Sequence, residues 1–463
     1  MSHSLFRLKP VAEAAGSGEL KRSMGRIPLL LFAVGSIIGS GIFVILGVAI
    51  PKAGPAVLLS FLLAAFAALL SALSYAELAS TIPASGSSYS YAYVTLGEIV
   101  AWVVGWMLML EYGVSVAAVS VGWGEYLNSF LSSFGVTIPN EFSNPPGDGG
   151  VFNVPALIVV FACAALLIRG ASESARLNAV MVLLKIAILI FFSVVAFTAF
   201  DGNNLTPFLP LGLLGVTAAA GQVFFSYIGF DGVSTAGEEA KNPRRDLPFA
   251  IIGSLAVVTA LYLLVTLAAL GARNWQQDEG QGSEAVLADI ANEAVGGSWA
   301  GDVIALGAII SIFSVVLVTL YGQTRILFAM GRDGLLPKVF TRVSPRSQTP
   351  VTNTIIVACV IAVPAALVSL GQLAEATSIG TLGAFTIVNI GVIVLRRKHP
   401  DLPRGFKTPL FPLLPILGIV LIIVIVAGLD PITWLVFAVW MVVGLVIYFA
   451  YSRRHSALNK ESA

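Results

Sequence analysis

The sequence predicts an all-α protein that crosses a membrane many times, and three observations support this fold class. Hydrophobic residues make up 57% of the 463-residue chain and charged residues only 11%, whereas soluble proteins carry about 25% charged residues. Apolar runs of about 18 residues or more, long enough for a membrane helix, recur along the whole length. The basic residues gather in alternate segments between those runs. The net charge of +1 gives no indication of a nucleic-acid partner.

The apolar runs predict twelve spans within one membrane-embedded domain, residues 27–452, flanked by tails at 1–26 and 453–463. Turn-forming Pro and Gly residues separate the spans. The third span is longer than a bilayer requires, so we expect it to tilt or to extend beyond the membrane. The spans are predicted near residues 27–50, 56–80, 98–128, 154–169, 175–200, 212–237, 247–271, 301–329, 351–370, 373–396, 411–428 and 431–452.

The distribution of Lys and Arg predicts the orientation. With the N-terminus in the cytoplasm, 23 of the 26 basic residues fall in the tails and in loops on the cytoplasmic side, and the outside loops hold Lys52 and Arg273. The remaining basic residue, Lys185, lies inside a span. Cytoplasmic loops of membrane proteins carry such an excess of positive charge. We therefore expect both termini to be cytoplasmic.

The first ten spans form two sets of five, about residues 27–200 and 212–396, with the spans of 411–452 outside them. Because five is odd, the second set enters from the opposite side, which makes an inverted repeat. Each set begins with a span that glycines interrupt. Unpaired backbone inside a membrane is tolerated only where it lines a cavity or packs within protein. Two such breaks at corresponding positions indicate the binding site of a carrier that works by alternating access.

The first break supplies small residues that let the backbone unwind and approach a ligand. The N–H groups that begin a half-helix suit a carboxylate, and the carbonyls that end the other half suit an ammonium group. An amino acid carries both groups. The alternative is that Gly35 and Gly39 only form a close-packing face between helices. The candidate residues of this break are Ile37, Ile38, Gly39, Ser40 and Gly41.

The second break combines small residues with aromatic ones. Ser226 lies within a run of Phe and Tyr, and Gly229 follows it. Phe224 or Phe225 could cover an occupied site as a gate, although Phe is also common in ordinary membrane spans. The candidate binding residues of this break are Phe225, Ser226 and Ile228.

Lys185 is the charged residue that stands out most. Its neighbours in the fifth span are all apolar, and a buried ammonium costs about 2.5–3.5 kcal/mol on the lenient insertion scale. It follows Arg176 by nine residues, which places it about 13 Å further along the helix, too deep for easy snorkelling. We expect Lys185 to exchange a proton, or to place a fixed cation where a sodium-coupled carrier would bind its ion.

Two acids lie within the early spans. Glu111 is deep in the third span, and three interpretations stay open for it: a partner of Lys185, a second proton site, or a structural hydrogen-bond acceptor. Glu77 lies closer to the end of the second span and is interpreted as a helix-end residue.

Enzymatic and metal chemistry find no support in the sequence. His3, His399 and His455 all fall in tails or loops, and the chain has no P-loop, nucleophile elbow or metal-ligand cluster. We expect no catalytic residue, no metal and no cofactor. Cys163 and Cys359 lie in apolar runs and are interpreted as packing residues.

Several motifs together resemble one family. The chain resembles the amino acid–polyamine–organocation (APC) superfamily and, within it, bacterial members of the cationic amino acid transporter family. The similarity extends over about residues 25–450. It is carried by Gly35 to Phe43, by Tyr75-Ala76-Glu77-Leu78, by Leu110-Glu111-Tyr112 with Val121-Gly122-Trp123, and above all by Phe224 to Pro248, which includes Glu238, Glu239, Lys241, Asn242 and Pro243.

The resemblance implies a leucine-transporter-type fold and proton-coupled transport of L-amino acids across the bacterial inner membrane. It implies contacts of the substrate carboxylate or backbone with Ile37, Ile38, Ser40 and Gly41, and of the amine and side chain with Phe225, Ser226 and Ile228. Lys185 matches a lysine that replaces a sodium ion in proton-coupled relatives, so no sodium is expected, and Glu111 matches a glutamate linked to that region. The Ser40 position is often Thr in the family.

Two alternatives to proton-coupled uptake stay open. An exchanger would swap amino acids with no net proton flux, and a carrier of cationic amino acids or polyamines would share the same fold. No ring of acidic residues marks a cationic side-chain pocket, which favours neutral or broad substrates. A nutrient sensor or a channel is disfavoured, the latter because no span is lined by repeated polar residues. Membrane lipid is the one further partner expected, and oligomeric state is not predicted.

Overall fold

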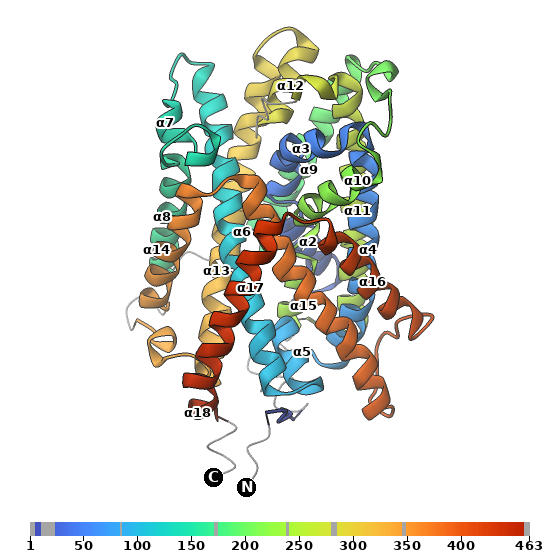
Figure 1. Ribbon diagram of the computed structural model, residues 1–463, viewed down its shortest axis with the longest axis vertical. Helices are drawn as coiled ribbons and strands as arrows, with labels where there is room; N and C mark the ends of the chain where they lie inside the picture. Colours follow the sequence, from blue (N-terminus) through green and yellow to red (C-terminus); the bar gives the residue numbers. More distant parts are fainter. Residues whose placement is uncertain are drawn as a thin grey trace.

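The computed structural model describes residues 5–10, 24–83, 86–170, 175–237, 240–278, 285–344 and 349–457, and its regular elements are helices (Figure 1). A helix lies at each of the twelve predicted ranges. The longer helices are α2 Arg26–Ile37, α3 Ser40–Ala53, α4 Val57–Thr81, α5 Ser87–Thr95, α6 Glu98–Ser132, α8 Val154–Ile168, α9 Ala175–Thr198, α10 Gly212–Phe224, α11 Pro243–Ala272, α12 Val286–Val295, α13 Trp299–Arg332, α14 Val351–Leu367, α15 Leu370–Lys398, α16 Leu413–Ala427 and α17 Pro431–Ile447.

By length and composition, eight helical stretches of the described residues could cross a membrane, and the first of them, Arg26–Thr81, includes α2, α3 and α4. The helices α8, α14 and α16 are shorter but equally apolar. Large hydrophobic side chains such as Leu214, Leu435 and Val360 are 64–84% exposed, as lipid-facing residues are. The fold is therefore that of an integral membrane protein, while the count of twelve spans stays a prediction.

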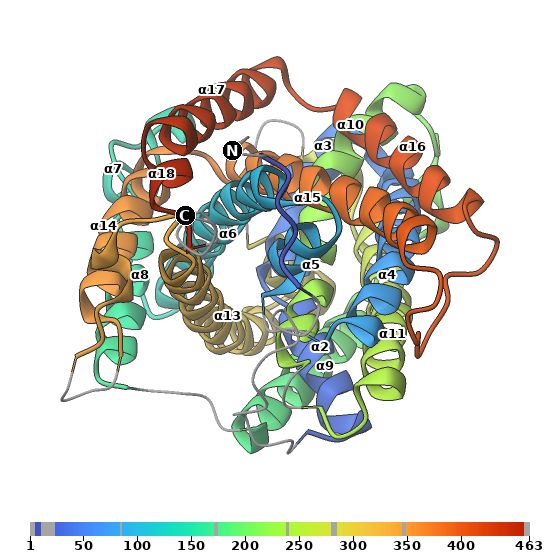
Figure 2. The ribbon, with the colours of Figure 1, turned by 90° about the horizontal axis from the view of Figure 1, so that it is seen from below.

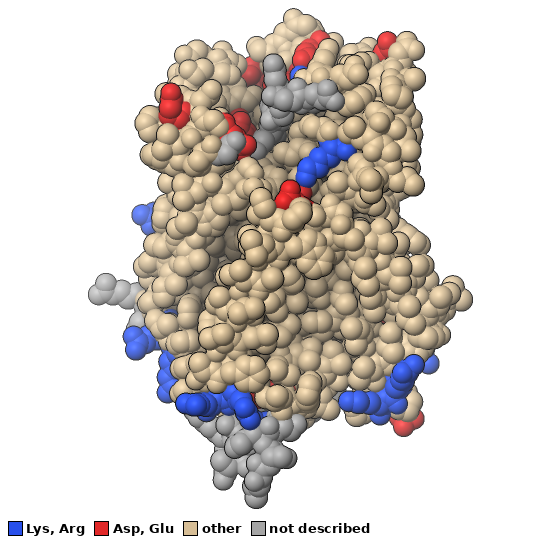
Figure 3. All heavy atoms as spheres, viewed as in Figure 1, with Lys and Arg blue, Asp and Glu red and all other residues tan. Residues whose placement is uncertain are grey.

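Charge separates along the long axis of the molecule. In the face shown in Figure 3 most of the Lys and Arg atoms gather at the lower end, and an almost uncharged belt lies above them. We call this lower end the basic end. Residues 5–10 and the short helix α18, Arg453–His455, both lie there (Figure 1). This is the distribution that a positive-inside orientation requires, and the sidedness itself stays a prediction.

The helices pack in two groups. The helices α2, α3, α4, α10 and α11 contact one another, and α6, α8, α13 and α14 form a second group, with α9 and α15 between them (Figure 2). The first group brings together the first two spans of each predicted repeat. This arrangement is the one that an inverted repeat would produce, although the repeat was inferred from the sequence alone.

The helix α5, Ser87–Thr95, is not among the elements expected from the sequence. Its alternation of Ser and Tyr has no apolar helical period, so it resembles a loop. In the structure Tyr89, Tyr91 and Tyr93 are all buried, which shows that tertiary packing, and not local pattern, makes this helix. Residues 5–10 pack on the junction of α5 with α6, where the N–H of Lys9 donates to the carbonyl of Tyr93 at 3.2 Å.

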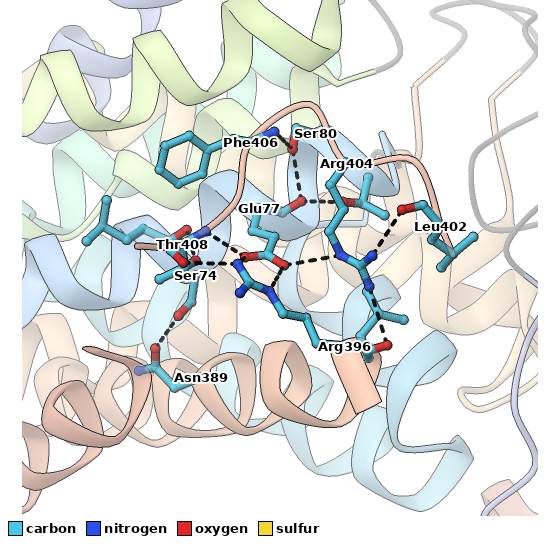
Figure 4. A network of polar contacts seen from close by, with 12 residues as sticks. Ser74, Glu77, Ser80, Asn389, Arg396, Leu402, Arg404, Phe406 and Thr408 are labelled. Carbon is cyan, nitrogen blue, oxygen red and sulfur yellow. Dashed lines mark hydrogen bonds and ion pairs between the residues drawn. The ribbon is translucent and has the colours of Figure 1, made fainter. Parts of the chain in front are cut away.

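Glu77 is the hub of a buried polar network at the basic end (Figure 4). Its carboxylate is 1% exposed and accepts two hydrogen bonds from the Arg396 guanidinium, each at 2.6 Å. Arg404 lies 3.3 Å away, and the N–H of Thr408 donates at 2.8 Å. The network joins α4 to α15 and to the loop that precedes α16. Glu77 is thus a helix-end residue, as predicted, but one that links three segments.

Replacing Glu77 by Gln removes the charge that neutralises two guanidinium groups. Breaking a buried ion pair by removing one partner costs about 3–5 kcal/mol, so the apparent melting temperature in detergent should fall by several degrees. Glu293→Gln is the matched control, because the Glu293 side chain is 53% exposed and lies 3.6 Å from Arg273, and ion pairs with a partner in water contribute about 1 kcal/mol or less. Equal melting of the two variants would show that the Glu77 network adds no stability.

Candidate functional site

Both predicted helix interruptions are present. In the first, α2 ends at Ile37 and α3 begins at Ser40, with Ile38 and Gly39 between them in non-helical conformations. In the second, α10 ends at Phe224 and a 3-10 turn follows over Phe225–Tyr227. Gly229 then has φ of +118° before a second 3-10 segment, Phe230–Ala236. We call these the first break and the second break.

The two breaks lie against each other, and each contributes a glycine to the contact. A Cβ on Gly41 of the first break would overlap the Cα of Ser226 in the second, and would lie 2.7 Å from the Ser226 Oγ. A Cβ on Gly229 of the second break would overlap the carbonyl oxygen of Ser36, just before the first. Real Cβ contacts are not this close, so the approach requires glycine at both positions. The positive φ of Gly229 adds to that requirement.

The backbone groups of the breaks are partly used within each break. The N–H of Ile38 donates to the carbonyl of Val34 at 2.8 Å, and the N–H of Gly39 to that of Ile37 at 2.7 Å. The first N–H groups of α3, which begin with Ser40, have no partner inside their own helix. They point a positive dipole end toward the breaks, as an anion site requires.

The predicted binding residues are found at the breaks. Ile37 and Ile38 are buried, and so are Phe225 and Ser226, whereas Ile228 is half-buried. The Oγ of Ser226 makes no hydrogen bond within the described part of the chain. The structure describes only the backbone of Ser40. Glu238 and Glu239 of the sequence motif lie outside the described residues.

The two candidate gate residues have different surroundings. Phe224 is fully buried, and its ring lies 6.1 Å from that of Phe385 on α15. Phe385 in turn packs against Tyr75 and Phe230. Phe224 therefore belongs to an aromatic cluster of the core. Phe225 is 5% exposed, and the assignment of a gate to either residue stays a prediction.

Lys185 lies beside the first break. It is 2% exposed on α9, and its Nζ donates to the carbonyl oxygen of Gly35 at 3.3 Å. Gly35 belongs to the last turn of α2, whose final carbonyls have no helical partner and carry the negative dipole end. The two helices can approach this closely because Gly35 has no side chain. A Cβ at this position would overlap Val182 of α9. The ammonium is thus directed at the helix end that the first break creates.

Glu111 is 1% exposed on α6, near Asp231 of the second 3-10 segment, and the two carboxylates would repel each other if both were ionised. Asp231 is equally buried and was not among the predicted site residues. Its place directly after Gly229-Phe230 was the only available signal. The Oε2 of Glu111 has no hydrogen-bond partner among the described residues.

A second polar hub lies at the end opposite the basic end. Glu375, near the start of α15, binds the Nζ of Lys52 at 2.7 Å and accepts a hydrogen bond from Gln222 at 3.3 Å. The N–H of Asp430 and the hydroxyl of Thr433 complete its partners. Glu375 therefore joins α3 and α10, the halves that lie on this side of the breaks, to α15 and α17. Glu375 was not among the residues predicted from the sequence.

A largely apolar helical bundle in which two interrupted helices meet inside the protein defines the class of membrane carriers. A family model described as amino acid permease matches residues 25–451. The chain therefore belongs to the amino acid permease family, in the APC superfamily, and the predicted resemblance is confirmed.

The chain is 45% identical over 468 residues to the branched-chain amino acid permease BcaP of Bacillus subtilis (strain 168). The aligned region covers 99% of this chain and 100% of that protein. It is 44% identical over 464 residues to the methylthioribose transporter of the same organism, with the same coverage. It is also 37% identical over 396 residues to the vacuolar cationic amino acid transporter 4 of Arabidopsis thaliana, 83% of this chain and 65% of that protein. These relatives are permeases and transporters, and the chain is not an enzyme.

Gly41→Ala tests the contact between the breaks. The new methyl group must push Ser226 away, and such overpacking costs about 1–3 kcal/mol, so we expect a lower melting temperature and a loss of amino acid uptake. Gly113→Ala on α6 is the matched control, because its Cβ would meet its nearest neighbours at 3.8 Å, an ordinary contact. Normal uptake by Gly41→Ala would show that the breaks are not in the contact described.

Proposed function

We propose that this permease carries neutral L-amino acids, branched-chain ones among them, across the plasma membrane by alternating access with a coupled proton. The observation that carries the proposal is the direct contact of the two breaks through Gly41 and Gly229. One small region thereby combines the first N–H groups of α3, the last carbonyls of α2 and apolar side chains.

An amino acid zwitterion fits this combination. Its carboxylate would bind the first N–H groups of α3, and its ammonium would bind carbonyls of the second break or of the end of α2. Its side chain would lie among apolar residues. Phe225 and Ile228 supply such surfaces, and Val315 of α13 lies where a Cβ on Gly39 would contact it at 3.1 Å.

The names of the relatives suggest two classes of substrate and do not distinguish between them. BcaP is named for branched-chain amino acids, and a relative of nearly equal identity is named for methylthioribose. Methylthioribose has neither a carboxylate nor an ammonium group, so it would leave both helix ends without a charged partner. The geometry of the breaks therefore favours the amino acid. A cationic side chain would require a nearby carboxylate, and Glu111 and Asp231 are the buried acids available for that role.

The coupling proposal rests on Lys185. Protonated, its ammonium binds the carbonyl of Gly35 at the end of α2. Without the proton it would lose the charge that favours this helix end. A proton arriving at Lys185 would thus change how firmly the first break is held, which is the change that couples a proton to the conformation of a carrier. The same reasoning makes a sodium ion at this place unnecessary.

The packing of the helices suggests which parts move. The group formed by α2, α3, α4, α10 and α11 carries both breaks, and polar hubs tie it to α15 at both ends of the molecule. The Lys52 side chain is 36% exposed and can leave Glu375 for water, whereas the Glu77 hub is buried. We propose that the group rocks against α15, α6 and α13, and that the Lys52–Glu375 pair separates when the site opens on its side.

Uptake into proteoliposomes tests the function. Labelled L-leucine should accumulate when the outside is more acidic than the inside, equally well with sodium or potassium, and excess L-valine should compete. Uptake of methylthioribose with none of leucine would refute the substrate, and a requirement for sodium would refute the coupling. Exchange of leucine for internal leucine without net uptake would favour the exchanger.

Lys185→Met should separate coupling from binding. The variant keeps the length and packing of the side chain but has no exchangeable proton, so the stimulation of leucine uptake by a proton gradient should fall to about a tenth or less. Leucine should still raise the melting temperature of the variant. Leu183→Met is the control, because Leu183 lies on the same helix but is 59% exposed. Stimulation equal to wild type would make Lys185 a structural residue.

A further inference from the structure

One hydroxyl group lies between the two breaks and belongs to neither. Tyr262, on α11, is fully buried. Its hydroxyl is 3.1 Å from the carbonyl oxygen of Ile37, which ends α2, and 3.1 Å from the carbonyl oxygen of Ser226 in the second break. Ile37 and Ser226 are both residues for which the sequence predicts a role in binding. Tyr262 was not among the candidates, because nothing in the sequence of α11 marks it.

A phenol hydroxyl has one hydrogen and two acceptors here. It can make one full hydrogen bond at a time, or share the hydrogen weakly between both carbonyls. A buried carbonyl without a donor costs about 1–3 kcal/mol. The carbonyl of Ile37 also accepts a hydrogen bond from the N–H of Gly39 at 2.7 Å, so the two carbonyls need the tyrosine hydrogen unequally. A donor that enters between the breaks can take the acceptor position that the hydroxyl leaves unfilled.

We propose that Tyr262 is a positioning residue for the substrate ammonium. Its hydroxyl aligns the carbonyls of Ile37 and Ser226 while the site is empty, and on binding it stays with one carbonyl while the ammonium takes the other. This inference rests on the proposed function, since it requires a substrate with an amino group. It assigns to α11 a part in a site that the sequence ascribes to the broken helices alone.

The position of Tyr262 does not depend on its hydroxyl. The ring packs edge-on against Phe61 of α4, with the ring centres 6.1 Å apart, and against Tyr227 at 5.5 Å. Phe in place of Tyr262 would keep these ring contacts and remove only the hydroxyl. Tyr126 of α6 offers a matched control outside the breaks. It is also fully buried, and its hydroxyl donates to the carbonyl of Phe43, one turn into α3, at 2.6 Å.

Tyr262→Phe in the full-length protein, reconstituted in proteoliposomes, tests the proposal by the Michaelis constant for L-leucine. We expect that constant to rise about tenfold, because the ammonium would form a weaker hydrogen bond to a carbonyl that the hydroxyl no longer aligns, while the maximal rate changes by less than about twofold. Tyr126→Phe, which also loses a buried hydroxyl-to-carbonyl hydrogen bond, should leave both values near wild type. An unchanged Michaelis constant in Tyr262→Phe would overturn the proposal.

A substrate analogue without the amino group distinguishes an effect on the ammonium from a general distortion of the binding site. 4-Methylpentanoate has the carboxylate and side chain of leucine, so its inhibition constant should change by less than about twofold in Tyr262→Phe if the hydroxyl acts only on the ammonium. A loss equal to that for leucine would mean that the variant merely distorts the site, and would also overturn the proposal. If wild type itself takes up no amino acid, the proposed function fails instead, and the two failures are distinct.

Discussion

A side chain on Gly41 or Gly229 would hold the two broken helices apart, and the proposed site depends on their contact. Backbone atoms of the opposite helix occupy the place that a Cβ on each glycine would need. These atoms belong to Ser226 at Gly41 and to Ser36 at Gly229. The contact brings the first N–H groups of α3 close to the carbonyls of the second break. Groups that each helix leaves without a partner of its own thereby lie close to those of the other helix. The same broken backbone would be too costly in contact with lipid.

Charged residues lie at three places around this centre, and they differ in their exposure to water. Lys185 is buried beside the first break and binds the end of α2. Glu77 is buried at the basic end with two guanidinium partners, and Glu375 at the opposite end has a lysine partner that reaches water. A buried ion pair is expensive to separate, and an exposed one is not. In the proposed motion, the end of α15 near Glu77 therefore stays attached to α4. The end near Glu375 separates from Lys52.

The sequence predicted most helices and both breaks, because hydrophobic length and interrupting glycines are local signals that a membrane makes strong. It did not predict α5, which is helical only because its tyrosines are buried by other segments. It could not pair Lys52 with Glu375, or place Tyr262 between Ile37 and Ser226, since those partners lie 36 to 323 residues apart and no local pattern records their contact. Lys185 was found because a lone charge among apolar residues is costly wherever it lies. Its partner, the carbonyl of Gly35, is backbone and leaves no trace in the sequence.

The central claim is that the two breaks form one amino acid site, and an experimental structure with bound L-leucine tests it most directly. The account predicts density for leucine between the start of α3 and the Phe225–Ile228 segment. The carboxylate should lie within hydrogen-bond distance of the first N–H groups of α3, and the ammonium should lie against the carbonyl of Ile37 or Ser226. Leucine bound elsewhere in the bundle, with the Gly41–Ser226 contact unchanged and the space between the breaks empty, would contradict it.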